Sequence, residues 1–331
     1  MKTLFPLLAV ITLILLVVAG VQFANLQFLF GIIIPYAALA TFVAGIIYRV
    51  LKWAGSPVPF CIPTTCGQQK SLPWIKQNKL ENPSGLPGVI GRMALEVFFF
   101  RSLFRNIKTE MRAGAKVVYG SDKWLWLAGL SFHWSFLIIL LRHFRFFSMK
   151  LPFPIHVVEI LDSFLQIGVP LLYMTDVVIL AAVSYLVIRR LTIPQVRYIS
   201  LAADFFPLFL ILGIAGTGVL MRYFTKVDII NVKQLAMGLI SFNPAIPSGG
   251  IGVMFYIHLF LISVLFAYFP FSKLVHMAGV FLSPTRNMAN NSRMVRRVNP
   301  WNYPVHVHTY EEYENDFRAK MKMAEIPVDK E

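Results

Sequence analysis

The chain has 331 residues, of which 57% are hydrophobic and only 14% are charged, and its formal net charge at pH 7 is +15. A mean hydropathy of +0.64 excludes an ordinary soluble domain. Crossing a hydrocarbon core takes about 20 apolar residues. Six apolar runs are long enough, at residues 4–21, 28–48, 124–147, 168–188, 199–221 and 251–282. Because these runs are continuous rather than alternating, they predict an all-α integral membrane protein with six transmembrane helices.

The distribution of Lys and Arg indicates how the predicted helices are oriented. If both termini lie in the cytoplasm, the cationic residues on the outer side are Arg142, Arg145, Lys150, Arg222, Lys226 and Lys233. All the other Lys and Arg then fall on the inner side, which is the positive-inside pattern of a multi-pass protein of the cytoplasmic membrane. The excess charge therefore indicates contact with the lipid bilayer, and no nucleic-acid partner is expected.

Residues 1–51 form the first predicted unit, a pair of transmembrane helices. The apolar part of the first helix, residues 4–19, is longer than the roughly 7–15 residues of a secretory signal core. No small-residue cleavage site follows it, so we expect an uncleaved helix.

Residues 52–123 form the second predicted unit, a basic cytoplasmic loop. In residues 92–118, Phe, Leu and Val stand beside Arg and Lys at helical spacing. That pattern predicts a helix lying in the headgroup region, or one packed on a partner. Cys61 and Cys66 are the only cysteines, and such a pair cannot complete a four-thiolate metal site alone. Ordinary loop thiols are the simplest interpretation; a site shared with a partner and a redox-active pair are the alternatives.

Residues 124–283 contain the other four predicted helices and are expected to form the core. The last of these is long and contains Pro270, which removes one helical hydrogen bond and predicts a kink. Residues 284–331 are polar and too few for a domain, so we expect a tail that docks on a cytoplasmic partner.

Four histidines lie inside two of the apolar spans. His133 and His143 are ten residues apart in one span, and His258 and His276 are eighteen apart in another. Ionisable side chains inside a membrane are costly and rare, which makes each of them a candidate for function. Neutral imidazole is also a usual ligand of haem iron. Two helices with two histidines each can supply four axial ligands, enough for two bis-histidine haems.

The order of the spans predicts which histidines pair. The two spans run in opposite directions, so His133 and His276 lie toward the cytoplasm, while His143 and His258 lie toward the exterior. Helical rise separates the first two histidines along the chain by about 15 Å and the last two by about 27 Å. Eighteen residues make five whole turns, so His258 and His276 are expected on one side of a continuous helix. A proton relay, a metal pathway and coincidence are the alternatives to haem ligation.

Three segments of the core resemble a known family. They are FHWSFLIILLRHF (132–144), IRRL (188–191) and FYIHLFLISVLFAYFPFSKLVHMAGVFLSPTR (255–286). Together they resemble the dihaem cytochrome b subunit of respiratory nitrate reductase, the gamma-subunit family, over residues 124–297. The resemblance implies a four-helix dihaem core in which His133, His143, His258 and His276 bind two haem b groups. It also implies that quinol is oxidised near the outer haem and that electrons pass to a cytoplasmic iron–sulfur subunit.

A fourth segment suggests a narrower resemblance. PFCIPTTCGQQKSLPWI (59–75), with the extra N-terminal helix, is similar to the DsrM family, the membrane cytochromes of the Dsr complex of sulfate reducers. This implies a cytoplasmic partner of heterodisulfide-reductase type (DsrK-like), further Dsr subunits, and menaquinol electrons used to reduce the DsrC trisulfide in dissimilatory sulfate or sulfite reduction. The alternatives are a gamma subunit of a respiratory nitrate reductase or heterodisulfide reductase and, from another class, a proton- or metal-coupled transporter.

Quinol oxidation releases two protons and therefore needs a base near the outer histidines. The candidates on that side are Lys150, Glu159 and Asp162, with Asp176 further into the fourth span. Asp176 is the sharpest of them, because a carboxylate at its depth is costly unless it is paired or neutral. Arg142 and Arg145 flank His143, and we expect them to pair with haem propionates.

Overall fold

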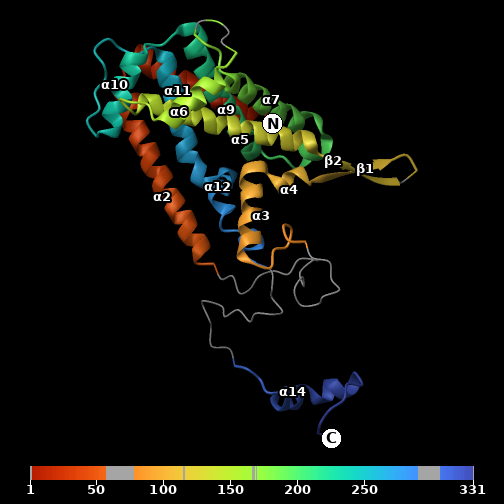
Figure 1. The fold of residues 1–331 in the computed structure, drawn as a ribbon. Helices are drawn as coiled ribbons and strands as arrows, with labels where there is room; N and C mark the ends of the chain where they lie inside the picture. Colours follow the sequence, from red (N-terminus) through yellow and green to blue (C-terminus); the bar gives the residue numbers. More distant parts are fainter. Residues whose placement is uncertain are drawn as a thin grey trace.

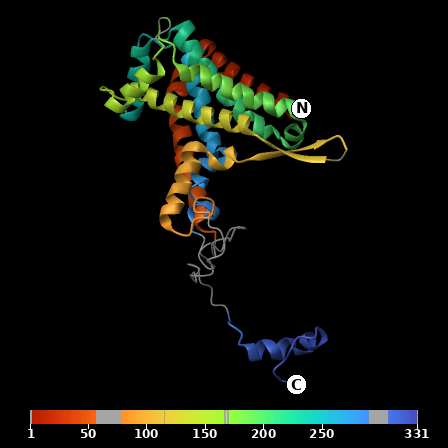
Figure 2. The same ribbon diagram turned by 45° about the vertical axis from the view of Figure 1, so that its right-hand side comes forward.

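The computed structural model describes residues 2–56, 78–114, 116–165, 168, 170–289 and 306–330. These residues are mostly helical, and the long helices pack side by side (Figures 1 and 2). Five of the described helices are long and apolar enough to cross a membrane: Leu4–Phe23, Leu29–Ala54, Lys123–Phe146, Ala202–Thr225 and Val253–Phe271. The predicted helical membrane class is confirmed. The predicted count of six spans is not.

The remaining predicted span corresponds to α7, Met174–Thr192, which is a regular helix of 19 residues. It differs from the five others because Asp176 lies in its first turn and Arg189 and Arg190 lie in its last. In the structure α7 packs against both α5 (Lys123–His143) and α9 (Ala202–Val219). It therefore belongs to the bundle despite its charged ends.

The two N-terminal helices pack against the rest of the bundle. α1 (Leu4–Val18) ends in a π-helical turn, Ala19–Phe23, and a second such turn, Leu29–Ile33, begins α2 (Ile34–Ala54). Between them Asn25 adopts a φ of 52°, a left-handed conformation that asparagine tolerates better than most residues. α1 packs on α9 and α11 (Val253–Tyr268), and α2 packs along α11.

The basic loop departs from the predicted single helix. α3 (Leu86–Phe99) and α4 (Arg101–Phe104) are helical, but β1 (Ile107–Arg112) and β2 (Lys116–Ser121) form an antiparallel hairpin that projects from the bundle (Figure 2). The prediction of a helix over 92–118 is wrong beyond residue 104, and the fold is not purely α-helical. β-Branched and aromatic residues in β2 favour a strand, and Gly114, at φ 82°, suits a hairpin loop.

The last predicted span is broken rather than kinked. α11 ends at Tyr268, two 3₁₀ turns follow (Phe269–Phe271 and Lys273–Val275), and α12 (His276–Gly279) begins at the histidine. The break is held by side chains: Arg49 Nε donates to the Pro270 carbonyl at 2.8 Å, and Ser272 Oγ accepts from the Leu274 amide at 3.2 Å. Because the helix is interrupted, counting five whole turns from His258 to His276 is wrong.

Shorter elements complete the fold. Two of them, α6 (Phe153–Asp162) and α10 (Ile229–Ile240), lie in segments expected to be exterior loops. α8 (Pro194–Ile199) joins α7 to α9, and α13 (Pro284–Asn287) contacts α3. In the tail, α14 (Tyr310–Met323) begins with a capping box formed by Thr309 and Glu312.

Candidate functional site

One pair of histidines comes from α5 and the break after α11. The ring centroids of His133 and His276 lie 6.0 Å apart. His133 Nδ1 lies 2.7 Å from the Gly129 carbonyl, one turn earlier in α5, and His276 Nδ1 lies 2.9 Å from the Lys273 carbonyl. The break at Pro270 therefore matters, because it brings residue 276 opposite residue 133 without a continuous helix.

The second pair includes His143, which lies ten residues after His133 on α5. The rings of His143 and His258 are nearly parallel, with 14° between their planes and 6.4 Å between their centroids. His143 Nδ1 lies 2.7 Å from the Ile139 carbonyl. His258 is 9% exposed, and its Nδ1 lies 2.9 Å from Thr217 Oγ1 on α9.

Thr217 acts as an acceptor for His258. Its hydroxyl lies 2.8 Å from the Gly213 carbonyl, an oxygen that can only accept. The hydroxyl proton is used there, so the hydroxyl oxygen remains to accept the His258 Nδ1 proton. The next residue, Gly218, has no side chain to crowd the ring; a Cβ there would lie 3.4 Å from His258 Cε1. Sequence reasoning missed Thr217, although a hydroxyl in a glycine-rich apolar run was a visible signal.

The same tautomer results at all four histidines, because each Nδ1 faces an acceptor. With the proton on Nδ1, the lone pair is on Nε2, which is the form of a metal ligand supported by an outer hydrogen bond. Two imidazoles on opposite sides of one metal, with bonds of about 2 Å, would have centroids about 6 Å apart. The two pairs have centroids 6.0 and 6.4 Å apart, with 80° and 14° between their ring planes, so the spacing of each pair is that of two imidazoles on one metal.

The separation of the two pairs is set by α5. Since α5 is continuous from Lys123 to His143, its rise separates the two pairs by about 15 Å along the helix. The value of about 27 Å from the sixth span assumed an unbroken helix, which the structure does not have.

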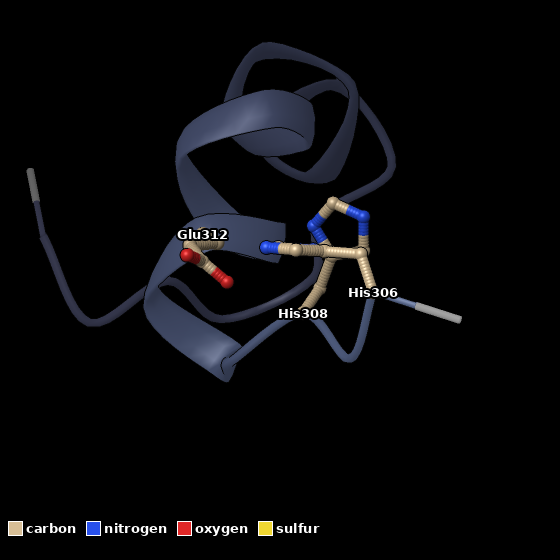
Figure 3. A group of neighbouring side chains, drawn as sticks. All are labelled: His306, His308 and Glu312. Atoms are coloured by element: carbon tan, nitrogen blue, oxygen red, sulfur yellow. The ribbon is translucent and has the colours of Figure 1, made fainter. Parts of the chain in front are cut away.

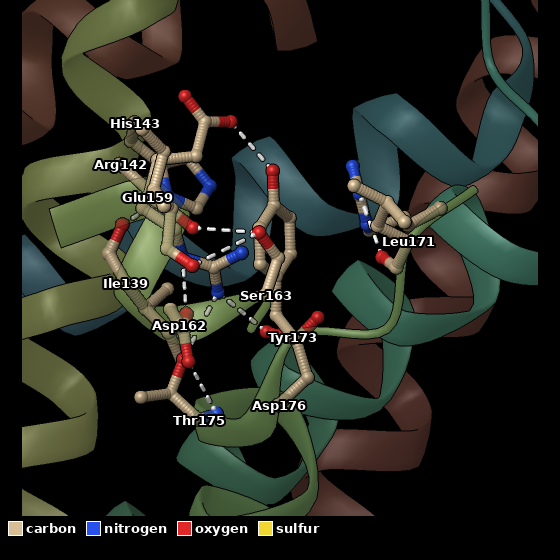
Figure 4. Close-up of polar contacts among 12 residues, drawn as sticks. Ile139, Arg142, His143, Glu159, Asp162, Ser163, Leu171, Tyr173, Thr175 and Asp176 are labelled. Carbon is tan, nitrogen blue, oxygen red and sulfur yellow. Dashed lines mark hydrogen bonds and ion pairs between the residues drawn. The ribbon is translucent and has the colours of Figure 1, made fainter. Parts of the chain in front are cut away.

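A buried ionic cluster surrounds Arg142, next to His143 (Figure 4). Arg142 is 6% exposed, and its guanidinium contacts Asp162 at 3.0 Å and Asp176 at 2.6 Å. Asp162 also accepts from the backbone amide of Thr175 at 2.8 Å and from its hydroxyl at 2.6 Å. One cation is thus shared by two carboxylates, and both carboxylates are held by further donors.

Two tyrosines tie this cluster together. The last turn of the α9 span, Leu220–Thr225, is π-helical, and from it Tyr223 donates to Asp176 at 2.8 Å. The Tyr173 ring lies against the guanidinium of Arg142 at 3.7 Å and that of Arg222 at 4.0 Å. The sequence offered no pattern for these tyrosines, because they come from segments far apart along the chain.

Glu159 lies at the edge of the cluster. Its Oε1 accepts from the Tyr173 hydroxyl at 2.5 Å and pairs with Arg145 at 3.0 Å. The structure therefore joins three of the four proton candidates, Glu159, Asp162 and Asp176, through Arg142 and Tyr173. It does not join Lys150, whose side chain is exposed.

Two ion pairs lie at the other end of the bundle. Arg189 at the end of α7 contacts Asp122, before α5, at 2.6 Å, and Lys273 contacts Asp204 in the first turn of α9 at 2.6 Å. Cys61 and Cys66 lie outside the described residues.

Comparison with known proteins identifies the family of this chain. Residues 88–298, which contain all four histidines, match the nitrate reductase gamma subunit family. The chain belongs to that family. It is also 45% identical over 279 residues to the Hdr-like menaquinol oxidoreductase cytochrome b-like subunit of Archaeoglobus fulgidus, covering 82% of this chain and 83% of that protein. The protein of the same description from Archaeoglobus profundus is 41% identical over 274 residues, covering 81% of each.

The predicted gamma-subunit family is therefore confirmed. Because the family consists of helical membrane cytochromes b, membership agrees with the helical bundle of this chain. The narrower resemblance to DsrM stays a prediction, because both relatives are described as Hdr-like menaquinol oxidoreductase cytochrome b-like subunits.

Proposed function

We propose that this gamma-family chain is a membrane cytochrome b that binds two haem b groups. His133 and His276 would ligate one haem, and His143 and His258 the other. The observation that supports this most is that both pairs have the spacing and the Nδ1 hydrogen bonds of axial ligands. When bound, each haem supplies reversible one-electron transfer. The chain itself holds the imidazoles in one tautomer, and α5 carries one histidine of each pair.

We infer that menaquinol is the electron donor and that it is oxidised at the end of the bundle near His143. The printed description of both relatives supports the quinol. Of the proton candidates, Glu159 suits the role of acceptor best. Both carboxylates are paired, Asp176 with Arg142 and Glu159 with Arg145, but the Glu159 side chain at the cluster edge is more exposed, 23% against 13%. The role of Arg142 and Arg145 toward haem propionates stays a prediction, and both guanidiniums already contact protein carboxylates.

We further propose that electrons leave at the His133 end to a cytoplasmic iron–sulfur subunit of heterodisulfide-reductase type, a DsrK-like protein. The description of the relatives as Hdr-like supports a partner of this kind. This orientation puts both termini in the cytoplasm and rests on the distribution of Lys and Arg. Use of these electrons for the DsrC trisulfide in sulfite reduction rests on residues 59–75 alone. Purification of the native complex tests the partner and the DsrC proposal together. An iron–sulfur subunit that co-purifies without DsrC-dependent activity would favour another Hdr-like role.

The haem proposal is tested by the spectrum of the purified chain. A dithionite-reduced minus oxidised difference spectrum should give two b-type haems per chain. His258→Ala should lose one of these haems and His133→Ala the other. His156 is an exposed histidine of α6, and His156→Ala should keep both haems. A folded protein without haem would refute the proposal and favour a transporter.

The role of Glu159 is tested by menaquinol oxidation in membranes. Glu159→Gln should slow turnover at neutral pH and change its pH profile, because the amide cannot take up a proton. His156→Gln, an exposed residue on the same helix as Glu159, serves as the matched control. Equal rates and pH profiles for the two variants would remove Glu159 from the proton path.

A further inference from the structure

A group of metal-ligating side chains lies in the tail, within the segment 306–330. His306, His308 and Glu312 each offer a ligand atom, and these atoms lie within 4.8 Å of one another. Figure 3 shows the Glu312 carboxylate facing the imidazoles at the start of α14. All three side chains are exposed. The group takes no part in the proposed electron path, which uses the histidines of the bundle.

Local structure brings these side chains together. Residues 306 to 309 are non-helical and lead into α14, and the rings of His306 and His308 lie 4.7 Å apart by centroid. Glu312 occupies the third position of the helix, from which a carboxylate reaches back over the residues before it. Its Oε2 accepts from the Thr309 amide at 2.9 Å, so the capping box fixes the carboxylate beside the two histidines.

The capping hydrogen bond leaves one oxygen of Glu312 available to bind a metal. A carboxylate has two oxygens, and the cap uses only Oε2 of Glu312. The neighbouring acidic residues are committed elsewhere: Glu311 pairs with Lys330, and Glu314 pairs with Arg318. Glu312 is therefore the carboxylate placed to ligate with Oε1 while Oε2 holds it in position, which is how outer hydrogen bonds orient metal ligands.

The donor set selects a class of cation. Imidazole suits Zn²⁺, Cu²⁺, Ni²⁺ and Fe²⁺, whereas Mg²⁺ and Ca²⁺ take oxygen ligands. Two histidines and one glutamate are also a known three-ligand set for zinc, in which a fourth position stays open. We propose that His306, His308 and Glu312 bind a divalent transition-metal ion of the zinc type. Its fourth position takes water or a side chain of a cytoplasmic partner.

Geometry and charge permit this. Tetrahedral ligands about 2 Å from one metal lie about 3.3 Å apart, so the side chains must close in from their present spacing. They are exposed and the rings lie 4.7 Å apart by centroid, so side-chain rotation suffices. The helix N-terminus disfavours a cation, but the Glu311 and Glu312 carboxylates lie in that first turn and offset it.

Zinc binding is measured on the full-length protein in detergent. After a chelator wash, Zn²⁺ is added by equilibrium dialysis and counted per chain, in a Cys61→Ser, Cys66→Ser background that removes the thiols as ligands. We expect one Zn²⁺ per chain, with at least tenfold weaker binding in His306→Ala and in His308→Ala. Glu312→Gln should also weaken binding while keeping the cap, because glutamine serves equally at this capping position. His156→Ala is the matched histidine control and should bind as the parent does.

A second readout is hydrogen exchange of residues 306–313 with and without Zn²⁺. Binding should slow exchange there in the parent and in His156→Ala, but not in His308→Ala. Haem content, measured in parallel, shows that each variant is folded. Zinc binding that is unchanged by His306→Ala and His308→Ala, or no binding at micromolar Zn²⁺ by the haem-loaded parent, would overturn the proposal.

Discussion

Replacing Thr217 by valine tests how the outer histidine pair is supported. The side chains have the same shape, but valine has no oxygen. The variant therefore removes the acceptor that lies 2.9 Å from His258 Nδ1 and leaves the ring in place. Because His258 is buried, no water replaces the lost partner, and the Ile214 carbonyl, which also contacts the imidazole, is the only acceptor left beside it among the described contacts.

The size of the effect follows from that lost bond. Leaving a buried donor unsatisfied costs about 1–3 kcal/mol. At about 1.4 kcal/mol for each tenfold change, this corresponds to roughly 5- to 150-fold weaker haem binding at the His143–His258 pair. Loss of an outer hydrogen bond to a metal-ligating histidine costs about 10- to 100-fold in metal affinity, which agrees. Haem binding at the His133–His276 pair should be unaffected, because these histidines bond to the Gly129 and Lys273 carbonyls.

The assay is haem transfer from the purified protein to an excess of apomyoglobin, followed in the Soret band. The wild-type protein should release its two haems in slow phases, and Thr217→Val should accelerate one phase by the factor given above. Thr41→Val is the matched control, because the Thr41 hydroxyl makes the same type of helical bond, to the Ala37 carbonyl at 2.8 Å, and contacts no histidine. Identical release from Thr217→Val and wild type would refute the assigned tautomer and the role of the hydroxyl.

Other substitutions test packing and charge. Arg142→Met should destabilise the protein by about 3–5 kcal/mol, measured as a fall in Tm, because two buried carboxylates lose their common cation. Adding Asp162→Asn should recover part of that loss. Gly45→Ala should cost about 1–3 kcal/mol, because a Cβ there would lie 2.6 Å from Pro270 Cβ. Burial raises the pKa of Glu314, but amide donors and Arg318 outweigh it and lower that pKa below 4.5. The tail contacts of Glu314 should therefore be intact above pH 4.5 and lost as the pH falls through its lowered pKa, as measured by amide exchange corrected for pH.

Each of these predictions has a control variant or a result that would contradict it. Gly91→Ala, where the nearest atom is 3.6 Å from the added Cβ, should leave Tm nearly unchanged; an equal loss at both glycines would contradict the packing argument. A double variant no more stable than Arg142→Met alone would argue against the shared cation. If Glu314→Gln keeps the pH dependence of the tail, another group is responsible for it.

Much of this protein was predictable from local sequence. Continuous apolar runs of the right length predicted the membrane helices, because a backbone in lipid must bond to itself. The spacing of His133 and His143 on α5 also held, since α5 is one unbroken helix. The hairpin at 107–121 was missed because a mixed basic and apolar pattern is compatible with both a surface helix and a strand pair.

The tertiary structure decided which distant residues meet. His276 reaches His133 although the helix that was expected to present it ends at Tyr268, and the contacts of Arg49 and Ser272 turn the kink expected at Pro270 into a break. Arg142 was adjacent to His143 in sequence, but its carboxylate partners come from α6 and α7. Periodicity and composition act over a few turns and therefore determine single elements. Contacts such as Thr217 with His258 depend on how those elements pack, which no local pattern records.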